Sequence, residues 1–242
     1  VLAQLGAAVT VQGPIPLGNT GKHTANVIGR FPGPPGAPRW VLGARYDTLP
    51  ASGPGADDNA SGVAVVLEVA RVLAGHPLPV TLEVVCFGGE EHVGRAGHHF
   101  GSRHYVAHQP PPLAMLSVDM VGYGPRLHAW RLPTSSSYLD SLLRRSALAL
   151  GIPLTVTTGP PHSDHEAFAA AGVPALWLEA LPEPAYHTPA DRPERLRAAA
   201  LARVGRLVTH LLTSLEPADL RLLQIAAANP QVVTQVGGPP RR

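Results

Sequence analysis

The sequence predicts an α/β fold, and two observations lead to this prediction. Short apolar segments of strand length alternate along the chain with longer segments whose apolar residues repeat every three to four positions. Several of the short apolar segments end directly in acidic residues or in loops rich in Gly and Pro. In such folds the sheet is largely parallel, and ligands bind at the carboxyl ends of its strands. We therefore expect polar side chains from separate strands to meet at one edge of the sheet.

The first half of the chain contains four expected strand regions and one helix. We expect one or two short strands within 9–31, the clearest at 24–31, and further strands at 39–46, 80–87 and 113–118. A helix is expected over 61–74, where apolar residues share one face: Val63, Val66, Leu67, Ala70 and Leu73. The Gly/His-rich segment 92–104 follows the third of these strand regions and has no clear period.

The second half of the chain continues the alternation. We expect a helix at 137–150, a strand at 154–158, a short helix at 163–171, a strand at 173–179 and a long helix at 193–215 with Pro at its start. We expect residues 1–215 to form a single domain. Residues 216–242 are then an extension, helical at first and disordered in its Gly/Pro/Arg tail. Residues 1–5 resemble the end of a helix, so we expect the natural chain to begin further upstream.

Composition narrows the class of protein. The chain has 242 residues, 45% of them apolar, which is enough for one large core. Its formal net charge of +2 gives no electrostatic footprint for nucleic acid, and its apolar runs are too short to span a membrane. Cys86 is the single cysteine, so it cannot form an internal disulfide, and we expect a buried, inert thiol. We therefore expect neither a nucleic acid nor a membrane as a partner.

Polar residues follow the expected strands at four places. Asp57 and Asp58 end the loop before the first helix, Glu90 and Glu91 follow the strand 80–87, Asp119 follows the strand 113–118, and His187 lies in the loop after 173–179. Each feature alone has an ordinary explanation: Asn59 or Ser61 could cap the helix near Gly62, and a Glu-Glu pair is often only solvated.

Together these residues predict a metal site. Three carboxylate positions at one sheet edge would repel one another without a cation. Oxygen and nitrogen ligands without a thiolate suit Zn²⁺, with Mn²⁺ or Co²⁺ as alternatives. In the pair Glu90-Glu91, one carboxylate can bind the metal while the other acts as a general base toward water at that metal.

At this point the sequence resembles a known family. It is similar to the zinc exopeptidases that include bacterial aminopeptidases and glutaminyl cyclases, family twenty-eight of the metallopeptidases. The matching motifs keep the family's order and are 54–62 (PGADDNASG), 87–91 (FGGEE), 101–106 (GSRHYV), 118–120 (VDM), 163–165 (SDH) and 186–188 (YHT) with Asp191. The resemblance implies a phosphorylase/hydrolase-like, three-layer α/β/α sandwich around a mixed, mostly parallel sheet. Residues 1–215 would then be one catalytic domain of the zinc-exopeptidase type.

The resemblance also implies a role for each site residue. Asp58 matches the aspartate that bridges two zinc ions, and Glu91 and His187 match the other ligands of one zinc. Asp119 matches a ligand of the second zinc, and Glu90 matches the general base. Asp164 lies in the Ser-Asp-His element near the site and is expected beside the ligands or the substrate. Asp57 is expected to form hydrogen bonds within the loop, while Cys86 and Tyr105 are expected to pack in the interior.

One departure from the family stands at Arg45. The family has His-x-Asp where this chain has Arg45-Tyr46-Asp47. The missing histidine would bind the second zinc, and a guanidinium cannot replace it because it has no free lone pair. We therefore expect one tightly bound zinc, where typical relatives have two, and Arg45 paired with Asp47 or Asp119. A histidine from the set His92, His98, His99 and His104 could substitute as a ligand, although histidines in a loop are more often solvated.

Three functions follow from the resemblance. The first is a zinc-dependent aminopeptidase that hydrolyses N-terminal residues from peptides, with water at the metal activated by Glu90. The second is a glutaminyl-cyclase-like acyltransferase, since in those relatives a single zinc is held by the residues that match Asp58, Glu91 and His187. The third is an inactive or weakened member, in which Arg45 has disabled the second metal site.

Overall fold

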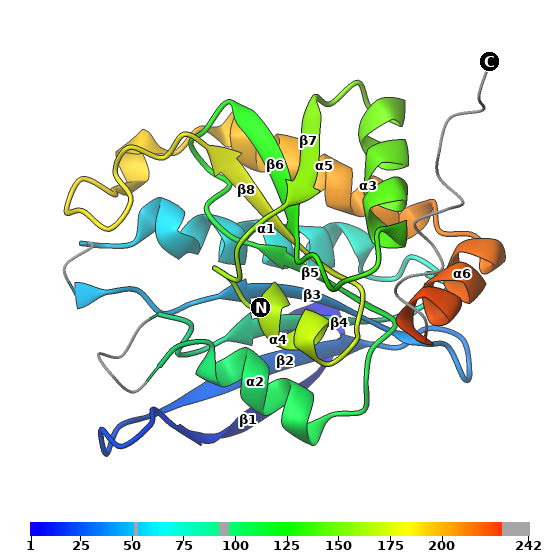
Figure 1. Ribbon diagram of the computed structural model, residues 1–242, viewed down its shortest axis with the longest axis horizontal. Coiled ribbons are helices and arrows are strands. Elements are labelled where there is room, and N and C mark those ends of the chain that lie inside the picture. The colour runs from blue at the N-terminus through cyan, green and yellow to red at the C-terminus, as the bar shows by residue number, and fades with distance from the viewer. Residues whose placement is uncertain (51–52, 92–96, 229–242) are drawn as a thin grey trace.

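The computed structural model describes residues 1–50, 53–91 and 97–228, and these residues form an α/β fold around one mixed sheet (Figure 1). Within them the sheet has eight strands in the order β1-β2-β4-β3-β5-β8-β6-β7. The strands are β1 (Ala8–Pro16), β2 (His23–Phe31), β3 (Arg39–Arg45), β4 (Thr81–Phe87), β5 (Ala114–Val118), β6 (Arg126–Arg131), β7 (Leu154–Thr158) and β8 (Ala175–Leu181). Four of their seven pairings are parallel, so the predicted mixed, mostly parallel sheet is confirmed.

Helices cover both faces of the sheet. One face carries α1 (Ser61–Leu73), α3 (Tyr138–Ala149), α5 (Ala198–Thr213) and α6 (Pro217–Ala228), and the other carries α2 (Phe100–His108) and α4 (His165–Ala170). In Figure 1, α2 and α4 lie in front of the sheet and α1 and α5 behind it. The predicted three-layer arrangement is therefore confirmed.

The central strands are apolar on both faces because helices cover both. Side chains alternate along β3, so Trp40 and Leu42 pack under α1 and α5 while Val41 packs under α2 and α4. All three are fully buried. A strand covered on both sides reads as a continuous apolar run, which is why β3 could be recognised from the sequence.

Parallel pairing brings the ends of four strands together. The strand β3 pairs in parallel with β4 and β5, and β5 pairs in parallel with β8. The carboxyl ends of these strands therefore meet at one edge of the sheet. The loops that follow them carry Asp58, Glu90, Asp119 and His187.

One expectation about the elements was wrong. The long helix expected at 193–215 is divided into a 3₁₀ turn (Pro193–Arg195) and α5, because Arg197 is extended and donates its backbone N–H to the carbonyl of Gly122 at 2.8 Å. The guanidinium groups of Arg195 and Arg197 also lie over the ring of Tyr123, which fixes this connection.

Two other elements were not expected. The strand β6 was missed because only Leu127 and Ala129 are fully buried in it, and its other positions are polar or aromatic. The helix α2 lies partly in the Gly/His-rich segment, which has no helical period.

The chain ends differ in how far they can be described. Residues 3–5 form one 3₁₀ turn, and α6 packs on α3, where the hydroxyl of Tyr138 donates to Asp219 at 3.0 Å. The tail expected to be disordered, 229–242, lies outside the described residues. In the part of the chain that is described, no helix combines the length and apolar character needed to cross a bilayer.

Candidate metal centre

Asp58 lies in a tight turn (Ala56–Ala60) between β3 and α1. The carboxylate of Asp191 accepts the backbone N–H groups of Asp57 and Asp58 at 2.7 and 3.0 Å. Asp57 is directed away from the sheet edge, where its Oδ1 accepts the N–H of Gly122 at 2.6 Å. Asp57 is thus a loop hydrogen-bonder, as predicted, and Asp191 fixes the backbone that presents Asp58.

Asn59 joins the same turn to the end of β5. Its Oδ1 accepts the N–H groups of Gly62 at 2.9 Å and Met120 at 3.1 Å, and its Nδ2 donates to the carbonyl of Val118 at 2.9 Å. The ordinary explanation for Asn59, an acceptor for the first N–H groups of α1, therefore holds for that residue. It does not account for Asp58, whose side chain is fully buried at the sheet edge.

Glu90 and Glu91 are fixed by Asp47. The two oxygens of the Asp47 carboxylate accept the backbone N–H groups of Glu90 and Glu91, each at 3.1 Å. Of the two partners expected for Arg45, Asp47 or Asp119, Asp47 offers only its backbone carbonyl, at 3.0 Å. Asp47 therefore orients the backbone of the Glu-Glu pair.

Three predicted ligands come together at this edge. Ligand atoms of Asp58, Glu91 and His187 all lie within 4.8 Å of one another. The Nε2 atom of His187 is 3.3 Å from Oδ2 of Asp58 and 3.4 Å from Oε2 of Glu91. Asp119, the fourth predicted ligand, is separate from this group and reaches it through Arg45.

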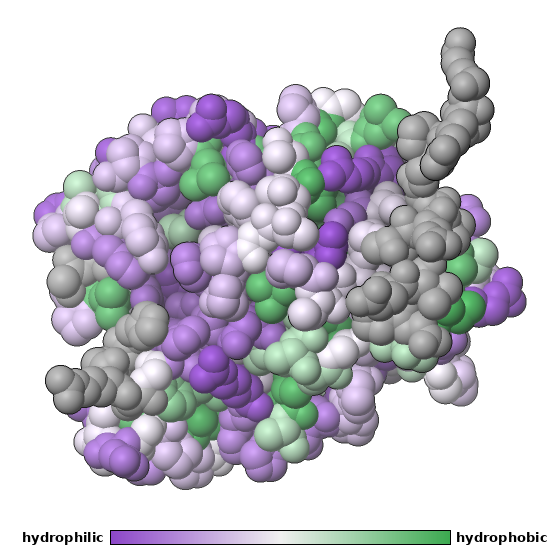
Figure 2. Space-filling view, viewed as in Figure 1, coloured by the Kyte–Doolittle hydropathy of each residue, from purple (hydrophilic) through white to green (hydrophobic). Residues whose placement is uncertain are grey.

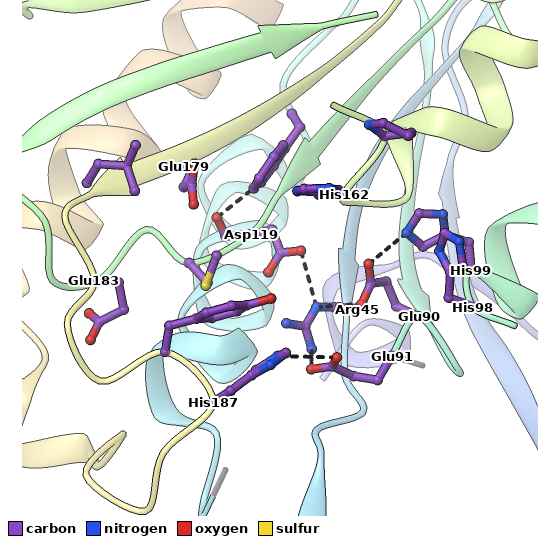
Figure 3. A pocket seen from close by; sticks show the side chains of 15 residues that line it. Arg45, Glu90, Glu91, His98, His99, Asp119, His162, Glu179, Glu183 and His187 are labelled. Carbon is purple, nitrogen blue, oxygen red and sulfur yellow. Dashed lines mark hydrogen bonds and ion pairs between the residues drawn. The ribbon is translucent and has the colours of Figure 1, made fainter. Parts of the chain in front are cut away.

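Arg45 occupies the middle of the carboxylates (Figure 3). Its guanidinium lies 2.9 Å from Oε1 of Glu91, 3.2 Å from Oδ2 of Asp119 and 3.3 Å from Oε2 of Glu90. It also forms an ion pair with Oδ1 of Asp58. Pairing with Asp119 was expected; the pairing with the other three carboxylates was not.

The carboxylates of Asp58 and Glu91 are each divided between two partners. One oxygen of each, Oδ1 or Oε1, faces Arg45, and the other, Oδ2 or Oε2, faces His187. The guanidinium therefore leaves one oxygen from each carboxylate, together with the imidazole nitrogen, on the opposite side. These three atoms form the group with the geometry of a metal site.

The protonation of this cluster reflects its burial and its excess of acids. Burial raises the pKa of Glu91 to about 7 and that of Asp119 to about 6, although Arg45 opposes both shifts. Burial, and then the positive charge of Arg45, lowers the pKa of His187, so its imidazole is neutral near pH 7. A neutral imidazole is the form that binds a metal.

The donor set fits a divalent metal such as zinc. Among the described residues, Oδ2 of Asp58 and Nε2 of His187 are buried without a hydrogen-bond partner. Buried polar atoms are normally paired, so atoms that face one another without a donor between them call for a cation. Two carboxylate oxygens and one imidazole nitrogen, with room for water, are a catalytic zinc set. Asp58, Glu91 and His187 would hold the ion.

Asp119 and Asp164 lie deeper, beside Glu90. The hydroxyl of Ser163 donates to Oδ2 of Asp119 at 2.9 Å, the oxygen that also faces Arg45. Asp164 is fully buried, and burial together with the charge of Glu90 raises its pKa to about 8. Asp164 is therefore largely protonated near pH 7 and adds little charge to the cluster.

Sequence reasoning missed the role of His99. The histidine segment was considered as a source of a substitute ligand, but His99 lies between Glu90 and Glu166, at 2.8 and 2.9 Å. His104 stacks on a neighbouring histidine on α2, and His92 lies outside the described residues. No local pattern separates His99 from its neighbours, because the contact depends on how the chain returns to Glu90.

A cavity opens in front of the cluster. It has a volume of about 330 Å³, at the lower end of the range for small-molecule sites. Arg45, Glu90, Glu91 and His187 line it, together with further residues of β8 and its loop: Trp177, Glu179, Leu181, Glu183 and Tyr186. Figure 2 shows hydrophilic residues gathered around a hollow on the side where this loop lies in Figure 1.

Known proteins are similar to this chain in sequence and in fold. Residues 26–212 match the model of Peptidase family M28. Aminopeptidase YwaD of Bacillus subtilis (strain 168) is 35% identical over 181 residues, which are 69% of this chain and 38% of that protein. The structure of BSAP, a zinc aminopeptidase from Bacillus subtilis, has a TM-score of 0.72 at 32% identity and covers 79% of this chain and 50% of its own. Porphyromonas gingivalis glutaminyl cyclase has a TM-score of 0.75 at 26% identity, covering 87% of this chain and 84% of its own.

Proposed function

The chain belongs to peptidase family M28, and from this membership we propose that it is a zinc-dependent aminopeptidase that hydrolyses N-terminal residues from peptides. The chain spans only 38% of the length of the aminopeptidase YwaD, so the activity of that whole protein is not transferred automatically. The proposal therefore rests on family membership together with the site of this chain.

One observation supports the proposal best: Asp58 and Glu91 each direct one carboxylate oxygen to Arg45 and the other to His187. This arrangement leaves Oδ2 of Asp58, Oε2 of Glu91 and Nε2 of His187 grouped at the sheet edge, beside a cavity. Glu90 lies next to this group without belonging to it. Metal-assisted hydrolysis of an amide needs a group of metal ligands beside a carboxylate that does not itself bind the metal.

The residues divide the reaction between them. A bound zinc ion supplies a Lewis acid that polarises the scissile carbonyl and makes a nearby water more acidic. Glu90 takes a proton from the attacking water and passes it to the nitrogen of the leaving amine as the C–N bond breaks. Asp47 holds the backbone of the Glu-Glu pair, and Asp191 holds the backbone of Asp58.

We propose further that the chain binds one zinc ion and not two. Arg45 carries a permanent positive charge at the centre of the carboxylates where relatives place a second metal, and it has no lone pair to donate. Asp119, a ligand in the two-metal pattern, is instead paired with Arg45 and Ser163. With a single metal to polarise the carbonyl and activate water, activity should be weaker than in a two-metal relative.

The test combines metal analysis with three substrates. Zinc per chain is measured by elemental analysis, and turnover is measured with an aminoacyl amide, a short peptide and a peptide that begins with Gln. We expect about one zinc ion per chain and release of the N-terminal residue. Cyclisation of the N-terminal Gln without hydrolysis would favour the glutaminyl-cyclase-like alternative, which uses the same ligand set. Zinc binding without any turnover would favour the inactive member.

The number of metals is tested by a pair of variants at Arg45. Arg45→His should recruit a second zinc ion and raise peptidase activity, because it restores a nitrogen ligand beside Asp119. Arg45→Gln removes the same charge without supplying that ligand, so it should not recruit a second zinc. Two fully occupied metals in the unaltered chain would show that another residue completes the second site and that the assignment of Arg45 is wrong.

A further inference from the structure

His99 links the proposed base to a second carboxylate. It is 1% exposed and lies directly before α2. Its Nε2 is 2.8 Å from Oε1 of Glu90, and its Nδ1 is 2.9 Å from Oε2 of Glu166. Because a carboxylate can only accept, both ring nitrogens donate when both contacts are made, and the ring is then an imidazolium.

The charges around His99 support this state. Burial by itself lowers the pKa of His99. The hydrogen bond and charge of Glu90, with the hydrogen bond to Glu166, outweigh burial and raise the pKa of His99 to about 9. Such charge-assisted hydrogen bonds are stronger than neutral ones, so the ring is a firm link between Glu90 and Glu166.

The backbone also fixes His99 against the Glu-Glu pair. Its N–H donates to the carbonyl of Glu90 at 3.0 Å, and the N–H of Phe100 donates to the carbonyl of Gly89 at 2.8 Å. His99 has φ of 58°, a left-handed conformation that side chains with a Cβ seldom adopt and that surrounding contacts must hold in place. Two backbone hydrogen bonds and one side-chain hydrogen bond therefore hold His99 and Phe100 against Gly89 and Glu90.

These contacts determine how Glu90 is oriented. Oε1 accepts from His99, and Oε2 lies 3.3 Å from Nε of Arg45, on the side of the metal centre (Figure 3). A carboxylate held at one oxygen by a buried imidazolium cannot rotate freely. The oxygen that faces the metal centre is then always the same one.

We propose that His99 is a positioning residue for hydrolysis: its Nε2–H holds Oε1 of Glu90, so that Oε2 is presented to the attacking water. Glu166 acts as the outer support of the ring, since it also accepts from Arg103 of α2 at 3.0 Å. Glu166 belongs to α4, so the support joins the two helices that cover this face. The proposal rests on the proposed function through the role of Glu90.

Two amide substitutions separate the two contacts of His99. In His99→Gln the amide nitrogen takes the place of Nε2, so it can donate to Glu90 but not reach Glu166 in the same way. In His99→Asn the amide nitrogen takes the place of Nδ1, so it can donate to Glu166 but is too short for Glu90. His99→Leu removes both donors at a similar volume.

The kinetic expectation is a loss in kcat and not in KM. His99→Asn and His99→Leu should lower kcat by about 10- to 100-fold, with KM and zinc per chain unchanged. His99→Gln should retain most of the kcat of the unaltered chain, because it keeps the hydrogen bond to Glu90. Equal activity of the Gln and Asn variants, or a loss of zinc that parallels the loss of activity, would overturn the proposal.

If the His99 variants do not fold, a pair of variants at Glu166 tests the proposal. Glu166 is partly exposed, so its substitutions disturb the interior less. Glu166→Gln retains an acceptor for Nδ1–H and should keep most of the kcat. Glu166→Leu removes this acceptor and should lower kcat by several-fold, and a kcat equal to that of Glu166→Gln would count against the proposal.

A spectroscopic readout separates this proposal from the proposed function. In the chain with ¹⁵N-labelled histidine, two ring N–H protons of His99 should be protected from solvent exchange. Glu90→Gln should shift one of them and Glu166→Gln the other. If the unaltered chain turns over no peptide, the proposed function and the kinetic half of this proposal fail together. The NMR spectra still decide whether His99 holds Glu90, and two rapidly exchanging protons would show that it does not.

Discussion

Two clusters of charged side chains lie at different positions along β4, and their negative and positive charges are balanced in different ways. The first, which we call the Glu83 cluster, consists of Glu83 with Arg30, Arg39 and Tyr105. Glu83 is fully buried, and its Oε1 lies 2.6 Å from Arg30 and 3.2 Å from Arg39, while its Oε2 accepts from the hydroxyl of Tyr105. One carboxylate thus has two cations and a hydroxyl.

The second cluster has the opposite balance. At the carboxyl end of the same strand, one guanidinium, Arg45, is shared by four carboxylates: Asp58, Glu90, Glu91 and Asp119. His187 is neutral and adds no charge near pH 7. Of these four carboxylates, His99 contacts only Glu90, and it shares its charge with Glu166.

The difference distinguishes a structural cluster from the candidate metal centre. A buried carboxylate stabilises the fold only when cations and donors compensate for its lost hydration, and the Glu83 cluster meets this condition from its own residues. The cluster around Arg45 does not, so it keeps carboxylate oxygens available for a further cation. Burial alone therefore does not identify a site; an unbalanced buried charge does.

The largest effect is expected at Glu90. Glu90→Gln should lower kcat by about 10² to 10⁴, because the amide cannot take the proton of the attacking water. Zinc per chain, measured by elemental analysis, should stay nearly unchanged, since Glu90 is not part of the grouped ligand set. Glu91→Gln is the matched control, and it should lose zinc together with activity. Loss of zinc in Glu90→Gln would mean that the two glutamates have been assigned the wrong way round.

A smaller effect, of a different kind, is expected at Glu83. Glu83→Gln should lower the free energy of unfolding by about 2–4 kcal/mol, because Arg39 would lose its buried counter-charge. Urea unfolding measures this change. Zinc affinity should be the same as in the unaltered chain, since the Glu83 cluster has no place in the metal centre. A parallel loss of zinc affinity would show that the two clusters are not independent.

The smallest effect is a dependence of stability on pH at Glu179, which lines the cavity. Burial raises the pKa of Glu179 from its ordinary value of 4.5 to about 7. The folded state therefore keeps this proton to higher pH than the unfolded state does. The free energy of unfolding should fall by roughly 1–3 kcal/mol as the pH rises from about 4.5 to about 7.

The Glu179→Gln variant provides the control for this slope. Its amide oxygen can still accept from Nε1 of Trp130, which donates to Glu179 at 2.8 Å in the unaltered chain. The variant should be less sensitive to pH between these values, as measured by urea unfolding of the metal-free chain. The same slope in both proteins would assign the titration to other buried carboxyl groups, such as Asp164.

The sequence by itself determined most of the order of the elements, with β6 and α2 missed, and it pointed to the residues of the candidate metal group. Strands covered on both faces appear as apolar runs, and a parallel sheet brings their carboxyl ends to one edge, so a group of acids and His187 could be placed at that edge without coordinates. The resemblance to the exopeptidase family then singled out Asp58, Glu91 and His187 as the ligands of one zinc. The chemistry of Arg45 was also readable, because a guanidinium cannot bind a metal in any fold.

Only the tertiary structure decided how these residues are shared. Arg45 contacts four carboxylates from three different loops, whereas strand periodicity suggested only Asp47 or Asp119. The bond between His99 and Glu90 exists because His99, with a left-handed backbone conformation, lies against the loop that follows β4. Local patterns record whether a residue is apolar and at what spacing. Which charges are neighbours depends on contacts between distant segments, and these contacts leave no periodic signal in the sequence.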